Sequence, residues 1–110
     1  MAITYKILGQ VSPGASALTS LYTVPYGYSA ATSTLSICNL NASDAKFRIA
    51  VQPANAAVAF KHYVAYDTPV LAYDTVSLTI GMTLAETDVV SVYANTTNIS
   101  FSLFGSEINA

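Results

Sequence analysis

Apolar and polar residues alternate along several short segments of this sequence, which is the pattern of strands with one buried face. The clearest segment is Lys46–Gln52, and Val76–Ile80 and Ile99–Leu103 repeat the period with Ser or Thr at alternate positions. Hydroxyl-bearing residues suit the solvent face of a sheet. The alternation therefore predicts an all-β protein with nine residues in the core: Phe47, Ile49, Val51, Val76, Leu78, Ile80, Ile99, Phe101 and Leu103.

Five weaker strands can be drawn at Ile3–Leu8, Leu18–Val24, Thr32–Asn39, Phe60–Tyr66 and Val89–Ala94. Clusters of Pro, Gly, Asn and Asp separate the strands and predict turns. Asn55–Ala59 and Thr83–Asp88 are too short for helices and are expected to form single turns or loops in connections. About eight short antiparallel strands at this spacing predict an antiparallel sandwich or barrel. We expect a single β-sandwich domain over residues 1–110, jelly-roll or immunoglobulin-like.

Charged residues are unusually rare, at 9% of the 110 residues against 53% hydrophobic residues, whereas an ordinary soluble domain carries roughly 25% charge. Four basic residues and a net charge of -2 are too few for the phosphate contacts of a nucleic-acid-binding protein. Gly and Pro interrupt the uncharged run Ile7–Ser43, so no membrane-spanning segment is expected. Met1–Gln10 lacks the long apolar core that a secretion signal has, so no such signal is expected. The uncharged surface suits permanent contact with other protein.

No constellation of catalytic residues is visible, so we expect neither an enzyme nor a cofactor or metal site. His62 and Cys38 are single residues of their kind, which leaves no nucleophile–base pair and no zinc ligand set. His62 is interpreted as structural or surface-exposed, and Cys38 as a small hydrophobic residue in or beside a strand. Asp and Glu in the turns are interpreted as hydrogen-bonding backbone amides rather than as a weak calcium site: Asp67, Asp74, Glu86 and Asp88.

Tyrosine is in excess, with eight copies and no tryptophan. Half-polar aromatic side chains are favoured where one end is packed and the other meets a partner. Tyr26 and Tyr28 flank Gly27 in a predicted turn, where their rings could project outward. Together with Tyr5 in the first strand, they are the expected partner contacts.

Six segments taken together resemble small virion proteins of tailed bacteriophages, particularly those that infect cyanobacteria and other aquatic bacteria. They are Ile3–Gln10, Leu21–Pro25, Leu35–Asn39, Phe47–Val51, His62–Asp67 and Phe104–Ile108. The likeness covers nearly the whole chain. It implies a non-enzymatic component of the virion, assembled in the host cytoplasm. That component is either a decoration (cement) protein on the capsid or a part of the tail, baseplate or tail fibre.

The main hypothesis is a capsid decoration protein that binds identical copies, as a trimer, and other virion proteins such as the major capsid or tail proteins. Attachment would use apolar and Tyr-rich surface and the sheet edges of Ile3–Leu8 and Ile99–Phe104, with Met1–Leu8 more important for assembly than for folding. The competing hypothesis is a carbohydrate-binding adhesion module in which Tyr26 and Tyr28 stack on sugars. The absence of tryptophan counts against it.

Overall fold

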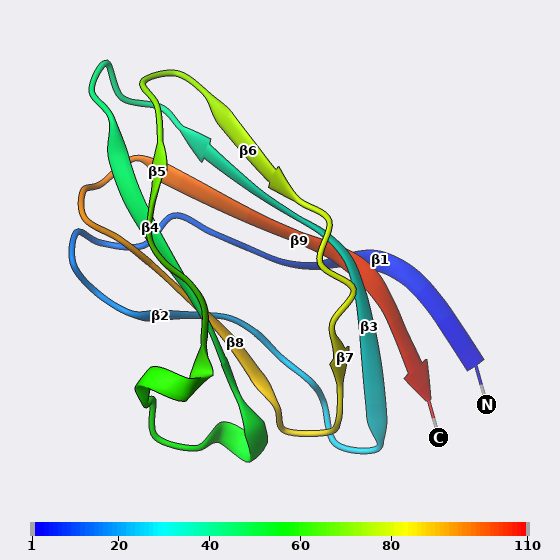
Figure 1. Cartoon of the computed structure of the whole chain (residues 1–110). Helices are drawn as coiled ribbons and strands as arrows, with labels where there is room; N and C mark the ends of the chain where they lie inside the picture. The colour runs from blue at the N-terminus through cyan, green and yellow to red at the C-terminus, as the bar shows by residue number, and fades with distance from the viewer. Residues whose placement is uncertain (1, 110) are drawn as a thin grey trace.

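The computed structural model describes residues 2–109, and within them every regular element is a strand or a single 3-10 turn (Figure 1). The strands are β1 (Ala2–Val11), β2 (Thr19–Thr23), β3 (Tyr28–Asn39), β4 (Ala45–Gln52), β5 (Tyr63–Val70), β6 (Thr75–Leu78), β7 (Thr83–Leu84), β8 (Val89–Ala94) and β9 (Ile99–Asn109). The turns are η1 (Pro53–Asn55) and η2 (Phe60–His62). The predicted all-β class is confirmed. In this part of the chain no helix is long and apolar enough to cross a membrane.

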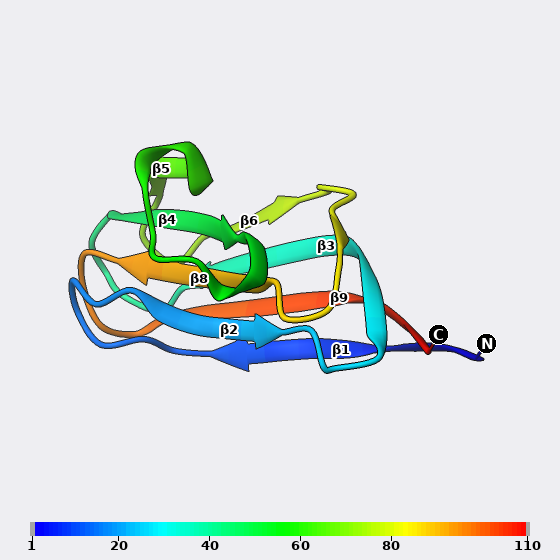
Figure 2. The ribbon, with the colours of Figure 1, turned by 90° about the horizontal axis from the view of Figure 1, so that it is seen from below.

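The strands form two antiparallel sheets that pack face to face as a sandwich (Figure 2). The first sheet has the order β1-β9-β3-β6, with β7 also paired to β3, and the second has the order β2-β8-β4-β5. The antiparallel pairs are nested along the chain: β1 with β9, β2 with β8, β3 with β6 and β7, and β4 with β5. Nested pairing of this kind is one long hairpin wrapped into two sheets, which is the jelly roll. Of the two predicted types, the strand order therefore selects the jelly roll.

The core lies between the two sheets. The ring of Phe47 from the second sheet meets the ring of Phe101 from the first edge to face, with centroids 6.3 Å apart. Five of the nine predicted core residues are completely buried: Phe47, Ile49, Ile99, Phe101 and Leu103. The other four are half-buried: Val51, Val76 and Leu78 against the core, and Ile80 in the connection after β6.

Two local assignments from sequence are wrong. Phe60–His62 forms a 3-10 turn and not the start of a strand, because the buried His62 accepts the backbone N–H of Ala59 at its Nδ1, 3.0 Å away. The Thr83–Leu84 segment was expected to be a loop, but it pairs with Ala30 and Ala31 of β3. The first difference arises from a side-chain cap, and the second from pairing between segments distant in sequence. The alternation of apolar and polar residues contains neither kind of information.

The two ends of the described chain lie side by side, because Ala2 pairs with Asn109 (Figure 1). β9 lies between β1 and β3, so both of its edges are already paired. The expectation that Ile99–Phe104 offers a free edge is therefore wrong. β1 is the edge strand of the first sheet, and its residues from Ala2 to Ile7 are exposed on both faces.

Two glycines, Gly9 in β1 and Gly105 in β9, permit close contacts of these strands with β2 and β3. A Cβ on Gly9 would overlap the backbone carbonyl oxygen of Leu21 in β2, and a Cβ on Gly105 would overlap that of Ala31 in β3. Neither neighbour is a flexible side chain that could move aside. Gly9 therefore lets β1 approach the second sheet, and Gly105 lets β9 lie tightly against β3.

Replacing Phe101 by Ala tests the central packing contact. We expect the free energy of unfolding to fall by about 3–5 kcal/mol, because the ring is fully buried and its loss leaves a cavity. Urea denaturation measures this change. The matched control is Phe104→Ala on the same strand, where the ring is only half-buried and the expected cost is about 1 kcal/mol. An equally small cost for Phe101→Ala would contradict the packing described.

Candidate interaction surface

The outward face of the first sheet carries no charged side chain among the described residues. Alternate positions of β1, β9, β3, β6 and β7 face outward there, since their sequence neighbours point into the sandwich. Most of these positions are Ser, Thr, Ala or Gln. The large apolar members lie on β1 and β9: Ile3, Tyr5, Ile7, Phe104 and Ile108. We call these five residues the β1–β9 stripe.

The β1–β9 stripe is built from cross-strand neighbours. Ile3 pairs with Ile108, and Ile7 pairs with Phe104. Between these two pairs Tyr5 lies opposite Ser106 and is 83% exposed. Apolar side chains are thus gathered at the edge of the sheet, where the backbone of β1 is also unpaired on one side.

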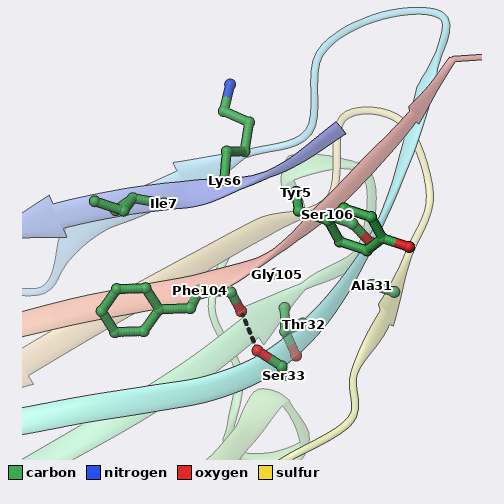
Figure 3. Close-up of a pocket in the computed structure, with 9 residues that line it drawn as sticks. All are labelled: Tyr5, Lys6, Ile7, Ala31, Thr32, Ser33, Phe104, Gly105 and Ser106. Carbon is green, nitrogen blue, oxygen red and sulfur yellow. Dashed lines mark hydrogen bonds between the residues drawn. The ribbon is translucent and has the colours of Figure 1, made fainter. Parts of the chain in front are cut away.

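A shallow groove runs beside the stripe, over the three strands β1, β9 and β3 (Figure 3). Tyr5, Lys6, Ile7 and Phe104 line it on one side, and Ala31 and Ser33 on the other. The amino group of Lys6 is paired with Glu107. The register of β3 against β9 shifts between Thr32 and Thr34 at this point. The Ser33 hydroxyl donates to the backbone carbonyl of Phe104 at 3.2 Å. This hydrogen bond holds the side of the groove that β3 forms.

On the opposite side of β1 and β9, a buried carboxylate joins the two sheets. The Tyr22 hydroxyl donates to Glu107 Oε2 at 2.6 Å, and Lys6 Nζ lies 3.2 Å from Glu107 Oε1. The hydrogen bond from Tyr22, assisted by Lys6, lowers the pKa of Glu107 despite its burial. Burial and the same hydrogen bond raise the pKa of Tyr22. Glu107 is therefore an ionised group that fixes β9 against β1 and β2.

The three predicted contact tyrosines lie in different environments. Tyr5 and Tyr26 are each 83% exposed, whereas Tyr28 is half-buried and packs against the core. The Tyr28 N–H donates to the Pro25 carbonyl at 3.1 Å, and Gly27 has a φ of 80°, so Tyr26 projects from a tight turn. Tyr5 faces outward from the middle of β1, apart from that turn. The structure does not bring the three rings into one site.

Two of the four acidic residues that were predicted to bind backbone amides do so. Asp74 accepts the N–H of Thr75, and Asp88 accepts those of Ala54 and Ala85. Asp67 instead binds the guanidinium of Arg48, and Glu86 is bonded through its backbone carbonyl, which accepts from the Thr87 hydroxyl. Within residues 2–109 no group of three or more His, Cys, Asp or Glu side chains is arranged to hold a metal ion. Cys38 is half-buried within β3.

Two groups of residues were not found from the sequence. One is the Lys6–Glu107–Tyr22 network, whose members are 85 and 101 positions apart. The other is a cluster of aromatic rings around Arg48 on the second sheet. The period-two pattern placed Arg48 correctly on the outward side of its strand, but no local signal identified the rings beside it.

No protein-family model and no curated protein matches the sequence. Among solved structures, the chain is similar to one in the acidic stable capsid structure of Helicobacter pylori bacteriophage KHP30. That match has a TM-score of 0.52 and 10% identity, and it covers 99% of this chain and 98% of the other. It is also similar to the Anabaena sensory rhodopsin transducer, with a TM-score of 0.44, 22% identity and coverages of 83% and 96%.

A third similar structure is that of infectious bursal disease virus strain Gx, with a TM-score of 0.49 and 10% identity. It matches 96% of this chain but 32% of the viral chain. At 10% identity the match to the bacteriophage capsid chain shows the fold alone. The bacteriophage capsid chain shares it from end to end and is about as long as this chain.

Tyr22→Phe tests the buried network through its dependence on pH. Folding lowers the pKa of Glu107 from its ordinary value of 4.5, so the stabilisation is present above that pH and is lost as pH falls below it. We expect the variant to lose about 1.5–3 kcal/mol of unfolding free energy near neutral pH, as for a hydrogen bond to a charged group.

The difference between wild type and Tyr22→Phe should shrink when unfolding is measured in acid instead of near neutral pH, because Glu107 is progressively protonated as the pH falls through its lowered pKa. Tyr26→Phe is the matched control, since its hydroxyl lies on an exposed ring, and it should change stability at neither pH. A Tyr22→Phe deficit that is equally large in acid would show that ionised Glu107 is not the partner that matters.

Proposed function

We propose that this protein is a structural component of a bacteriophage virion, and specifically a decoration protein that covers the outer surface of the capsid. The observation that carries the proposal is the uncharged outward face of the first sheet, with the exposed β1–β9 stripe at its edge. Exposed apolar surface of this kind marks a contact with another protein. The end-to-end likeness to a chain of similar length in a bacteriophage capsid structure supports a place in the virion.

The distribution of charge favours the outside of a capsid over its inside. The inner surface of a filled capsid faces nucleic acid, and contact with phosphates needs many Lys and Arg side chains. This chain has four basic residues, and two of them, Lys6 and Arg48, are already paired with carboxylates. A position that meets the protein shell and the solvent fits this surface better.

Attachment would combine burial of the stripe with use of the free backbone edge of β1. Ile3, Tyr5 and Ile7 alternate along that edge, so an added strand would gain both main-chain hydrogen bonds and apolar contacts. The strand also contributes to folding, since Leu8 is buried and Lys6 binds Glu107. Removal of Met1–Leu8 would therefore disturb folding as well as assembly, whereas a point substitution of an exposed side chain tests assembly alone. Met1 itself lies outside the described residues.

Tyr5→Ser should weaken binding to purified particles that lack the protein by at least tenfold, the equivalent of about 1.4 kcal/mol. The ring is 83% exposed and supports no core contact, so thermal unfolding should be nearly unchanged. Tyr73→Ser is the control, because Tyr73 is 74% exposed in the turn between β5 and β6. It should bind as wild type does.

Binding of the wild-type protein should also survive about 1 M salt, because screening weakens ion pairs but not apolar burial. Loss of binding in salt, or equal binding by Tyr5→Ser and wild type, would contradict attachment through the stripe.

We further propose that the protein assembles with copies of itself, as a trimer. Low charge and exposed apolar side chains leave a surface poorly suited to a dilute monomer. Sedimentation at micromolar concentration should give a species heavier than the 11.6 kDa chain. A monomer at that concentration would contradict self-assembly in the absence of a capsid.

A further inference from the structure

A second group of side chains gathers on the outward side of the second sheet, around Arg48 of β4. Its guanidinium carbon lies 4.1 Å from the ring centre of Tyr66 and 4.3 Å from that of Tyr93. Two further rings continue from Tyr66: Tyr63 at 4.9 Å and Phe60 at 6.4 Å, both edge to face. We call these five residues the Arg48 cluster. It lies on the β4–β5 side of the molecule, away from β1 (Figures 1 and 2).

The cluster is held rigidly although much of it is exposed. Asp67 Oδ1 lies 2.7 Å from Arg48 Nε and fixes the guanidinium between the two tyrosine rings. Phe60 is 85% exposed, yet the turn that carries it is closed by the hydrogen bond from the Ala59 N–H to His62 Nδ1. An apolar hollow lined by Val58, Ala59, Phe60 and Tyr63 lies next to the rings. A site that is ordered before binding loses little entropy when a ligand arrives.

The hydroxyl groups of the cluster indicate what kind of ligand fits. Among residues 2–109, the tyrosine hydroxyl that donates a hydrogen bond within the chain is that of Tyr22, so those of Tyr63, Tyr66 and Tyr93 are available to a ligand. A wholly apolar partner would bury these hydroxyl groups without hydrogen-bond partners, which opposes its binding. A ligand with its own hydroxyl groups avoids that cost.

The charge of the cluster indicates a neutral ligand. The charges of Arg48 and Asp67 neutralise each other within the site, and Lys46 is a single further charge near Asp67, so the site offers no dense charge of either sign to a polyanion or a polycation. The remaining requirement is a molecule with apolar faces for the rings and hydroxyl groups at its edges. Neutral carbohydrate meets both conditions.

We propose that the Arg48 cluster is a binding site for a neutral glycan. A sugar ring lies against Phe60 and the adjoining hollow. Sugar hydroxyls bond to tyrosine hydroxyls and to Asp67 Oδ2, whose hydrogen bond from Arg48 is long at 3.4 Å. The proposal does not depend on where in the virion the chain sits. The jelly roll occurs in lectins as well as in capsids, but the argument rests on the cluster and not on the fold.

Three neutral hexose oligomers serve as probes: maltohexaose, cellohexaose and mannohexaose. Titration of the isotopically labelled full chain, followed by NMR, should show at least one of them shifting the signals of Phe60, Tyr63 and Tyr66. Phe60→Ala should weaken that binding about tenfold, the equivalent of about 1.4 kcal/mol. Tyr66→Phe keeps the ring and removes the hydroxyl, and it should weaken binding by a smaller factor.

Tyr26→Ala is the matched control, because Tyr26 is as exposed as Phe60 but lies in the β2–β3 turn. It should leave the affinity unchanged, and thermal melting confirms that each variant is folded. Binding of a neutral ligand should also be the same in low and high salt. The proposal is overturned if none of the three oligomers binds, if Tyr26→Ala costs as much as Phe60→Ala, or if the cluster's signals shift only with protein concentration, which would make it a contact between copies.

Discussion

The position of β9 between β1 and β3 determines most of the other features of this protein. It brings the last strand beside the first and closes the nested series of pairs that makes the jelly roll. It also carries Phe101 into the core and Glu107 under Tyr22. Because β9 has no free edge, β1 becomes the exposed border of the first sheet.

The two outward faces of the sandwich have different chemistry. The first sheet presents Ser, Thr and a few large apolar side chains, with its one neighbouring base, Lys6, turned inward to Glu107. The second sheet carries Arg48 and its aromatic neighbours. The chain has few charged residues, and four of them form the ion pairs Lys6–Glu107 and Arg48–Asp67, which hold neighbouring strands together. The first face is therefore left free to meet a protein surface without desolvating any charge.

Alternation in the sequence was enough to predict the fold class and the centre of the core. Phe47, Ile49 and Phe101 were found because each lies in a strand whose two faces differ sharply in polarity. The extension of β9 beyond Phe104 was missed, since Gly105–Asn109 lacks regular alternation and is held by pairing on both sides. Strand pairing is a long-range property, and a short pattern does not contain it.

The candidate surface was predicted only in part, for the same reason. Tyr5 was named, but its apolar neighbours Phe104 and Ile108 join it only through the β1–β9 register. Tyr28 was expected to project like Tyr26, yet it starts β3 on the side that faces the core. The Arg48 cluster combines residues of three strands and a turn. No one segment of the sequence shows it.

A position on the capsid surface is the central claim, and the number of copies in the virion tests it most directly. A decoration protein repeats with the capsid lattice, whereas tail, baseplate and fibre proteins follow the low symmetry of the tail. Quantitative mass spectrometry of purified virions, calibrated against the major capsid protein, gives that number. The account predicts hundreds of copies per particle, in a fixed ratio to the major capsid protein. A few dozen copies or fewer would contradict it and place the chain in the tail.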